Sequence, residues 1–300
     1  MTANATLNDS VRDQEGIESL TRYYDDTWLD YRLVWLNREN LALHFGYYDD
    51  QHRRHRKALA NMNRVLADLA GVRADHRVLD AGCGVGGSSF WLAEERGAKV
   101  VGITPVQSQV DRANAVARQR GLEELVKFKR EDYRNCSQPN ASFDVVWALE
   151  SLCHAPVKAA AYAEFFRVLK PGGTLVIAEY IRSGRQLGSA SERALSEWLT
   201  SWAIPDIDTS SEHRCAAEAA GFDDFIARDV TRYTRRSLWR LYVASYLGIP
   251  IDKALRRLGL RNNVHEGNVV GSRRQFESLC RGDWFYGIIT AKKPVSLASG

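Results

Sequence analysis

The stretch VLDAGCGVGG, residues 78–87, decides the fold of this 300-residue chain. Its apolar start predicts a buried strand that ends at Asp80. The glycines that follow predict a tight loop, which lets a ligand approach the backbone before a helix begins. They are Gly82, Gly84, Gly86 and Gly87. The alternative is a glycine turn that binds nothing.

The acidic residue directly before this loop distinguishes it from the G-x-G-x-x-G loop of dinucleotide enzymes, which cradles a pyrophosphate. The carboxylate of Asp80 would repel a phosphate but attract a cationic amino group. S-adenosylmethionine carries an ammonium group, a carboxylate and a sulfonium. We therefore expect it as the cofactor, with S-adenosylhomocysteine as its demethylated product.

Strand and helix signals alternate outward from the loop. Strands are expected at residues 77–82, 98–104, 126–132, 142–150, 174–181, 225–231 and 284–294. Helices are expected between them, including one near residue 211 with Ser211 as its N-cap. Residues 171–173, PGG, predict a turn before the fifth strand. The alternation predicts an α/β fold with a doubly wound, mostly parallel, seven-stranded Rossmann-like sheet.

The regular alternation of strand and helix signals ends after residue 182, which indicates two insertions in one core. Together with the aromatic-rich start of the chain, they are expected to form a helical lid over the cofactor. The expected parts are an N-terminal helical lid segment (1–60), the cofactor-binding core (61–182), a lid insertion (183–211), a core helix and strand (212–231), a helical cap insertion (232–283), and a final core strand and tail (284–300).

Composition excludes several classes of protein. A net charge of +4 is too small to indicate nucleic acid, and no apolar run approaches the roughly 18 residues of a membrane span. The start of the chain lacks a signal-peptide pattern, so a cytoplasmic protein is expected. The five cysteines are widely spaced and odd in number, which predicts reduced thiols and no dedicated metal site.

Polar residues at the carboxyl ends of the expected strands are candidate cofactor ligands, because ligands of doubly wound sheets bind there. They are Thr104, Gln109, Asp132, Tyr133 and Glu150. Asp132 would accept a hydrogen bond from the adenine amino group, or else it caps a turn. Thr104 stands where a ribose-binding carboxylate is expected, so the ribose contact stays open.

Two residues near the end of the fourth strand are candidate general bases. Glu150 is the first choice, because a carboxylate in an apolar site has a raised proton affinity. His154 is the second. The alternatives are that Glu150 binds the cofactor and that His154 is a hydrogen-bonded structural residue.

Aromatic and basic side chains in the lid segments are candidate substrate ligands. Aromatic faces stabilise cations, although ordinary core packing is the alternative for each ring. These rings belong to Tyr23, Tyr24, Trp28, Trp198 and Trp202. Residues 52–57, HRRHRK, and the group Arg232, Arg235 and Arg236 suit a diphosphate or else form solvated surface patches. Mg²⁺ is expected only with a diphosphate substrate.

Three motifs carry a family resemblance: VLDAGCGVGG, FDVVWALE at 143–150 and RVLKPGG at 167–173. Over residues 76–181 the chain resembles the class I S-adenosylmethionine-dependent methyltransferases. The resemblance implies that Asp80, Gly82, Gly84 and Gly86 contact the methionine part of the cofactor. It also implies that Asp132 and Tyr133 flank the adenine.

A narrower likeness lies in ALESLCHAP at 148–156, which is similar to a segment of the sterol C24-methyltransferases. GIT at 102–104, HFGYYD at 44–49 and IITAKKP at 288–294 look like the tocopherol and sterol group. Prenyl diphosphate C-methyltransferases share the general layout. The likeness to sterol enzymes is weakened by the shorter chain and its arginine-rich last third.

This narrower likeness implies C-methylation of an alkene in a hydrophobic isoprenoid, through a carbocation that a base deprotonates. The alternatives are O- or N-methylation of an aromatic or prenylated metabolite, a cofactor-binding partner protein, and an RNA methyltransferase. The expected partner is a hydrophobic small molecule, with no nucleic acid and no transmembrane segment, and a homo-oligomer stays open.

Overall fold

A seven-stranded sheet forms the centre of the computed structural model, which describes residues 18, 21–22, 40–257 and 264–295. The strand order is β3-β2-β1-β4-β5-β7-β6, and only β7 runs antiparallel to its neighbours. The strands are β1 (Arg77–Ala81), β2 (Lys99–Thr104), β3 (Val126–Arg130), β4 (Phe143–Leu149), β5 (Leu169–Arg182), β6 (Asp223–Asp229) and β7 (Trp284–Lys292). The predicted doubly wound, mostly parallel sheet is confirmed.

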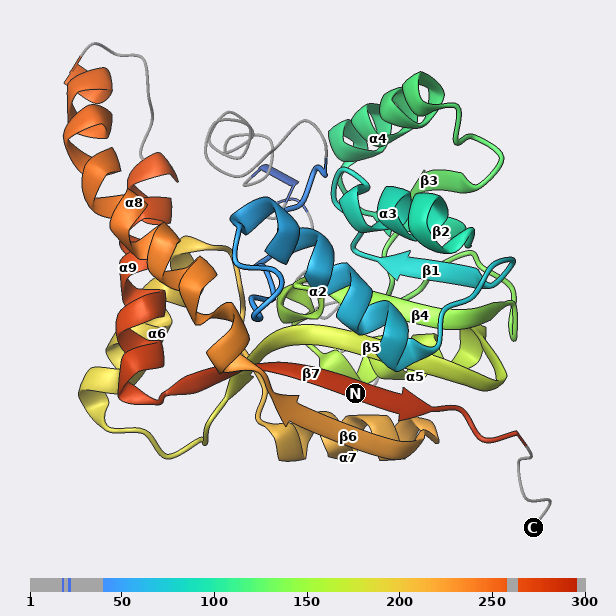
Figure 1. The fold of residues 1–300 in the computed structure, drawn as a ribbon. Helices are drawn as coiled ribbons and strands as arrows, with labels where there is room; N and C mark the ends of the chain where they lie inside the picture. Colours follow the sequence, from blue (N-terminus) through green and yellow to red (C-terminus); the bar gives the residue numbers. More distant parts are fainter. Residues whose placement is uncertain (1–17, 19–20, 23–39, 258–263, 296–300) are drawn as a thin grey trace.

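Helices cover both faces of this sheet (Figure 1). Helices α2, α3 and α4 supply side chains to the core on one face, and α5 and α7 to the core on the other. Their bounds are α2 (His55–Ala70), α3 (Gly87–Arg96), α4 (Gln107–Arg120), α5 (Lys158–Val168) and α7 (Ser210–Ala220), and a short 3-10 turn, η2 (Leu152–His154), precedes α5.

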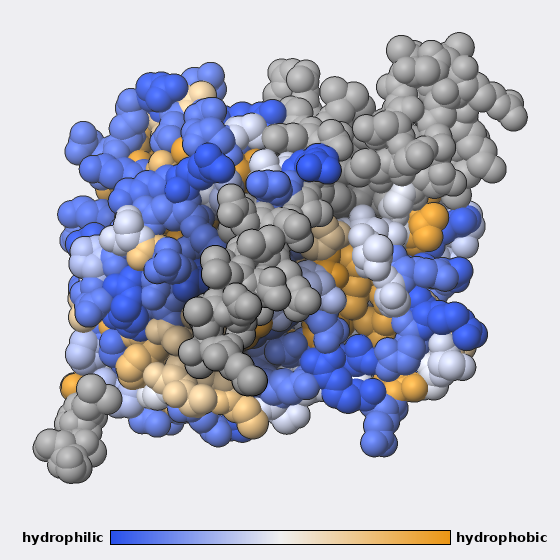
Figure 2. Space-filling view, turned by 180° about the vertical axis from the view of Figure 1, so that it is seen from behind, coloured by the Kyte–Doolittle hydropathy of each residue, from blue (hydrophilic) through white to orange (hydrophobic). Residues whose placement is uncertain are grey.

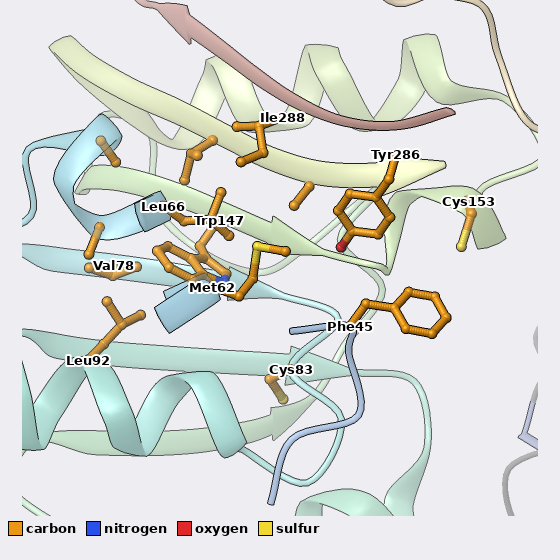
Figure 3. Close-up of a cluster of buried hydrophobic side chains, with 14 of the residues drawn as sticks. Phe45, Met62, Leu66, Val78, Cys83, Leu92, Trp147, Cys153, Tyr286 and Ile288 are labelled. Atoms are coloured by element: carbon orange, nitrogen blue, oxygen red, sulfur yellow. The ribbon is translucent and has the colours of Figure 1, made fainter. Parts of the chain in front are cut away.

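The two cores form because neighbouring side chains of a strand point to opposite faces. Val145 and Trp147 of β4 belong to the core under α2, whereas Val146 belongs to the core under α5. Figure 3 shows Met62 and Leu66 of α2 next to Trp147 in the first core. The near-continuous apolar runs of β1, β4 and β5 follow from this burial on both faces.

The PGG segment differs from the expected turn. Strand β5 begins at Leu169, which pairs with Phe143, and the next paired residue is Thr174 opposite Val145. Residues 170–173 therefore form an irregularity within the strand, and Gly172 has a φ of 78° there. The glycines allow a β-bulge in this strand, and the sequence pattern does not distinguish such a bulge from a turn.

The insertions form a helical body beside one end of the sheet (Figure 1). Helix α6 (Ser189–Ser201) follows β5, and α8 (Thr231–Arg257) and α9 (Val264–Arg281) lie between β6 and β7. Helix α6 packs against α9. Seen from behind, the surface is mostly hydrophilic, with a hydrophobic area on the side of these helices (Figure 2). No helix within the described ranges has the length and apolar character to span a membrane.

Candidate functional site

A cavity of about 390 Å³ lies at the carboxyl ends of the parallel strands. Its wall includes every predicted cofactor and catalytic residue except Gly86. They are Asp80, Gly82, Gly84, Thr104, Gln109, Asp132, Tyr133, Glu150 and His154. We call the part around residues 80–87 the glycine-loop end and the part around His154 and residues 203–205 the histidine end.

The glycine loop is packed too tightly for side chains. Gly82 has a φ of 86°, and a Cβ added to it would lie 2.3 Å from the Cβ of Ser151. A Cβ on Gly87 would lie 2.6 Å from the carbonyl oxygen of Leu41. The loop is thus held between β4's end and residues 41–44, which also line the cavity.

Asp80 is the buried negative group at the glycine-loop end. Its Oδ2 accepts a hydrogen bond of 2.6 Å from the Ser89 hydroxyl. Burial raises the pKa of Asp80 to about 6, and the Ser89 bond opposes this shift. No cation in the described part of the chain pairs with this carboxylate. The group therefore fits the ammonium of S-adenosylmethionine, which would supply the missing charge.

Thr104 and Gln109 form a hydrogen-bonded pair at the end of β2. The Thr104 hydroxyl donates to Gln109 Oε1 at 2.7 Å, and both side chains are buried. The pair stands where a ribose-binding carboxylate is expected. It holds the Gln109 carboxamide on the cavity wall, and a ribose contact through that carboxamide stays a prediction.

Asp132 both shapes a turn and faces the cavity. Its Oδ1 accepts a hydrogen bond from the backbone N–H of Arg134 at 2.9 Å, and its Oδ2 lies 2.8 Å from Arg134 Nη2. The alternative of a turn-forming Asp132 therefore has a structural basis. Tyr133 is buried beside it, and its hydroxyl donates to the Ser151 carbonyl at 2.9 Å. The adenine contacts of both residues stay predictions.

Glu150 is fixed by three hydrogen bonds. Its Oε1 accepts from the Phe45 N–H and the Tyr286 hydroxyl, and its Oε2 accepts from the Tyr180 hydroxyl, all at 2.7 Å. Burial raises its pKa to about 7, although the three donors oppose this shift. The carboxylate thereby joins β4, β5 and β7 to the segment before α2. Sequence analysis missed these partners of Glu150. The one available signal was the HFGYYD motif, which contains Phe45.

His154 presents a basic nitrogen at the histidine end. Its Nδ1 lies 3.2 Å from the carbonyl oxygen of Ala203, which can only accept, so Nδ1 carries the proton. The lone pair is then on Nε2. Burial lowers the pKa of His154 to about 4, so the ring is neutral near pH 7.

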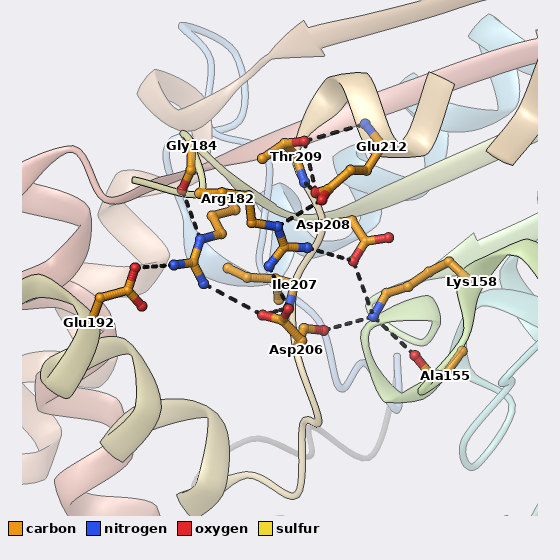
Figure 4. Close-up of polar contacts among 11 residues, drawn as sticks. Ala155, Lys158, Arg182, Gly184, Glu192, Asp206, Ile207, Asp208, Thr209 and Glu212 are labelled. Carbon is orange, nitrogen blue, oxygen red and sulfur yellow. Dashed lines mark hydrogen bonds and ion pairs between the residues drawn. The ribbon is translucent and has the colours of Figure 1, made fainter. Parts of the chain in front are cut away.

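A polar cluster surrounds Asp206, which directly follows residues 203–205 of the cavity wall (Figure 4). The buried Lys158 donates to the carbonyls of Ala155 at 3.0 Å and Asp206 at 2.7 Å. Arg185 pairs with Asp206, with Asp208 at 3.3 Å and with Glu212 at 2.8 Å. Sequence analysis missed these residues, because they are separated by up to 54 positions and form no motif.

Two of the predicted aromatic ligands, Trp198 and Trp202, lie away from the described wall. Trp198 is fully buried and packs against Tyr180 and Trp284. Trp202 packs against Trp198, and neither indole lines the cavity. Core packing, the alternative, accounts for these two rings. Tyr23, Tyr24 and Trp28 lie outside the described residues.

The predicted diphosphate ligands also lie elsewhere. Arg232, Arg235 and Arg236 line a separate surface groove with Trp239 and Phe276. Among the residues with described positions, no group of His, Cys, Asp and Glu is arranged to hold a metal ion. A role for the arginines toward a diphosphate stays a prediction.

Comparison with known proteins identifies the family of this chain. A family model described as "Methyltransferase domain" matches residues 79–177. The 27-O-demethylrifamycin SV methyltransferase of Amycolatopsis mediterranei is 35% identical over 218 residues, which cover 72% of this chain and 78% of that protein. The sterol 24-C-methyltransferase erg-4 of Neurospora crassa is 37% identical over 164 residues, 54% of this chain and 42% of that protein.

The fold is shared with solved structures. The crystal structure of the cyclase SpnF superposes with a TM-score of 0.77 at 25% identity, over 93% of this chain and 97% of that chain. The glycine-loop geometry, a buried Asp80 that pairs with no cation among the described residues, and the match to the rifamycin methyltransferase are consistent with one another. The chain therefore belongs to the class I S-adenosylmethionine-dependent methyltransferases.

Proposed function

We propose that this methyltransferase methylates a hydroxyl oxygen of a hydrophobic small molecule, with His154 as the general base. The observation that carries the proposal is the 3.2 Å contact of His154 Nδ1 with the Ala203 carbonyl, which assigns the ring proton to Nδ1 in a residue that lines the cavity. In this tautomer Nε2 carries the lone pair that a general base needs to take a proton from an acceptor hydroxyl.

The contacts indicate a different role for the cofactor, His154 and Glu150 in this reaction. When bound, the cofactor supplies a methyl group on a positively charged sulfur, which is the electrophile. The acceptor oxygen becomes an effective nucleophile when its proton moves to His154 Nε2. Glu150 is held by three donors, so we assign it to positioning residues 45 and 180 rather than to proton transfer.

The character of the wall supports a hydrophobic acceptor. Leu41, Leu149 and Ile204 line the cavity together with Pro205. An apolar wall lowers the free energy of a hydrophobic ligand and excludes water, which would compete as an acceptor. The rifamycin relative, which its name describes as acting at an oxygen, supports the same chemistry.

C-methylation of an isoprenoid alkene is the second candidate. The sterol 24-C-methyltransferase relative favours it, as does the raised pKa of Glu150, which suits removal of a final proton. The wall argues against it, because Tyr133 is the one Phe, Tyr or Trp that lines the cavity among the described residues. A carbocation is stabilised by several aromatic faces.

The test is methyl transfer from labelled S-adenosylmethionine to phenols, hydroxylated macrolides, prenylated quinols, sterols and prenyl diphosphates. Product structures are read by mass spectrometry and NMR. We expect an O-methyl product that His154→Ala reduces much more than Glu150→Gln. A new carbon–methyl bond, with Glu150→Gln as the more damaging change, would replace the proposal with the second candidate.

A further inference from the structure

The two basic stretches of the sequence meet on one surface. Tyr48 lies between them, since its hydroxyl is 2.7 Å from Nδ1 of His55 in the HRRHRK stretch. The guanidinium of Arg236 on α8 lies 5.3 Å from the Tyr48 ring centroid. The positive charge of Arg240 contributes, after burial, to the lowered pKa of His55. Residues more than 180 positions apart thus share one electrostatic environment.

One side of helix α8 carries most of this charge. Arg232, Arg235, Arg236 and Arg240 lie within about 140° of the helix circumference at 100° per residue. In the described ranges none of them pairs with a carboxylate. Arg232 and Arg235 stack on Tyr233 and Phe276, with guanidinium-to-centroid distances of 4.3 Å and 6.0 Å. Stacking restricts the guanidinium groups while their N–H edges can still bind anions.

Exposed aromatic rings accompany the arginines. Trp239 lies between Arg236 and Arg240 in the sequence and is 53% exposed. Tyr246, two helical turns further along the same side, is 45% exposed, and the guanidinium of Arg273 lies 3.7 Å from its ring centroid. A row of arginines with exposed Trp and Tyr is typical of protein surfaces at the headgroup level of a bilayer.

We propose that this face of α8, formed by Arg232, Arg235, Arg236, Trp239 and Arg240, docks on an anionic phospholipid surface. Each arginine gains electrostatic free energy near lipid phosphates, and Trp239 inserts its ring at the interface. The groove that Arg232, Arg235, Arg236 and Trp239 line with Phe276 is open and separate from the methyl-transfer cavity, which suits a flat partner better than a small substrate.

The docking face is also connected to the cavity. The Tyr48 N–H donates to the Tyr233 carbonyl at 2.8 Å, and the Gly46 N–H donates to the Ser237 hydroxyl at 3.1 Å. Three residues before Tyr48, the Phe45 N–H binds Glu150 on the cavity wall. A membrane on this face would therefore lie next to the segment that continues into the cavity wall at residues 41–44, where a hydrophobic acceptor would pass from the bilayer.

The test is flotation of the full chain with phosphatidylcholine vesicles, with and without phosphatidylglycerol. We expect binding to the anionic vesicles at low salt and its loss at high salt. The double variant Arg235→Glu/Arg236→Glu should weaken binding about tenfold or more, because it changes the charge at the surface by four. Trp239→Ala should weaken binding severalfold without changing its salt dependence.

A matched control carries the same charge change elsewhere. Arg118→Glu/Lys127→Glu alters exposed cations of α4 and β3, on the other side of the molecule from α8 (Figure 1). Its vesicle binding should stay close to that of the wild type, and circular dichroism shows whether both double variants are folded. Equal losses in the two double variants, or no binding of the wild type to anionic vesicles, would overturn the docking face.

The assay separates this inference from the proposed function, because vesicle binding requires no methyl transfer. The KM for a prenyl diphosphate tests the alternative that these arginines bind a diphosphate substrate. If Arg235→Glu/Arg236→Glu binds vesicles normally but raises the KM for a soluble prenyl diphosphate, the face binds substrate and the membrane proposal is wrong. If the wild type binds an acidic protein and not the vesicles, the partner is a protein.

Discussion

At the glycine-loop end of the cavity, ten consecutive residues supply Asp80 and its glycines, whereas the histidine end draws on segments far apart in the sequence. The ligands expected at the first end come from one strand, one loop and one helix, which pack against Ser151 and Leu41. The second brings together His154 from η2, Glu150 from the end of β4, residues 203–205 after α6, and Tyr286 from β7. Changes at the first end should therefore act locally on cofactor binding, and changes at the second should act through long-range contacts.

The largest effect is expected from Gly82→Ala. The new Cβ would lie 2.3 Å from Ser151 in a backbone with φ of 86°, so the loop must shift. We expect a loss of about 3 kcal/mol in the free energy of unfolding and loss of measurable S-adenosylmethionine binding. Thermal unfolding and calorimetry measure the two effects.

Gly71→Ala is the matched control for this loop. Gly71 has a φ of 64° but no atom within 4 Å of an added Cβ, so it isolates backbone strain from the clash. We expect the free energy of unfolding to fall by about 1 kcal/mol while cofactor binding stays normal. If both variants lost the same free energy of unfolding and the same cofactor affinity, the close contact of Gly82 with Ser151 would add nothing to the backbone strain.

The second largest effect is expected at the histidine end of the cavity. His154→Ala should lower kcat by about 100-fold or more, because it removes the general base, while cofactor affinity stays unchanged. In the wild type, kcat should rise with pH through about 4, where the imidazole becomes neutral, and then level off. A variant with unchanged kcat would return His154 to a structural role.

The pH dependence of cofactor binding distinguishes the two ends further. The pKa of Asp80 is raised to about 6 from 3.8, so the folded protein retains this proton between these values and, without ligand, loses stability as pH rises through this window. An ammonium ligand prefers the ionised carboxylate. We expect S-adenosylmethionine to bind about tenfold more tightly at pH 7 than at pH 5.

Asp80→Asn should bind the cofactor weakly and with little pH dependence over the same range. Glu150, whose pKa is about 7, also faces the cavity and titrates nearby. If Asp80→Asn keeps the full pH dependence, then Glu150 rather than Asp80 controls binding. Isothermal titration at both pH values decides between the two carboxylates.

The smallest effect is expected from Lys158→Met. The variant leaves the carbonyl of Asp206 without its donor, so the wall at residues 203–205 should loosen. We expect a rise of about threefold to tenfold in the acceptor KM, normal cofactor affinity, and a loss of about 1–3 kcal/mol in stability. Lys170→Met removes an ion pair to Asp144 elsewhere on the sheet, and it should leave KM unchanged.

Most of the fold was predictable because strand burial and helix termination are local in sequence. The limits of this reasoning are visible at α7, where Ser211 was expected as the N-cap. The structure uses Thr209, whose hydroxyl accepts from the Glu212 N–H while the Glu212 carboxylate accepts from the Thr209 N–H. The T-x-x-E spacing at 209–212 carried this signal, so the boundary was readable but misassigned.

The sequence by itself determined the glycine-loop end, because a strand, a glycine loop and a helix are consecutive and their ligands follow from the direction of parallel strands. It also pointed to Glu150 and His154 at the end of β4. Only the tertiary structure decided which groups these two residues contact. The donors to Glu150, the carbonyl that sets the tautomer of His154, and the meeting of residues 52–57 with α8 all depend on contacts between distant segments, which no local pattern encodes.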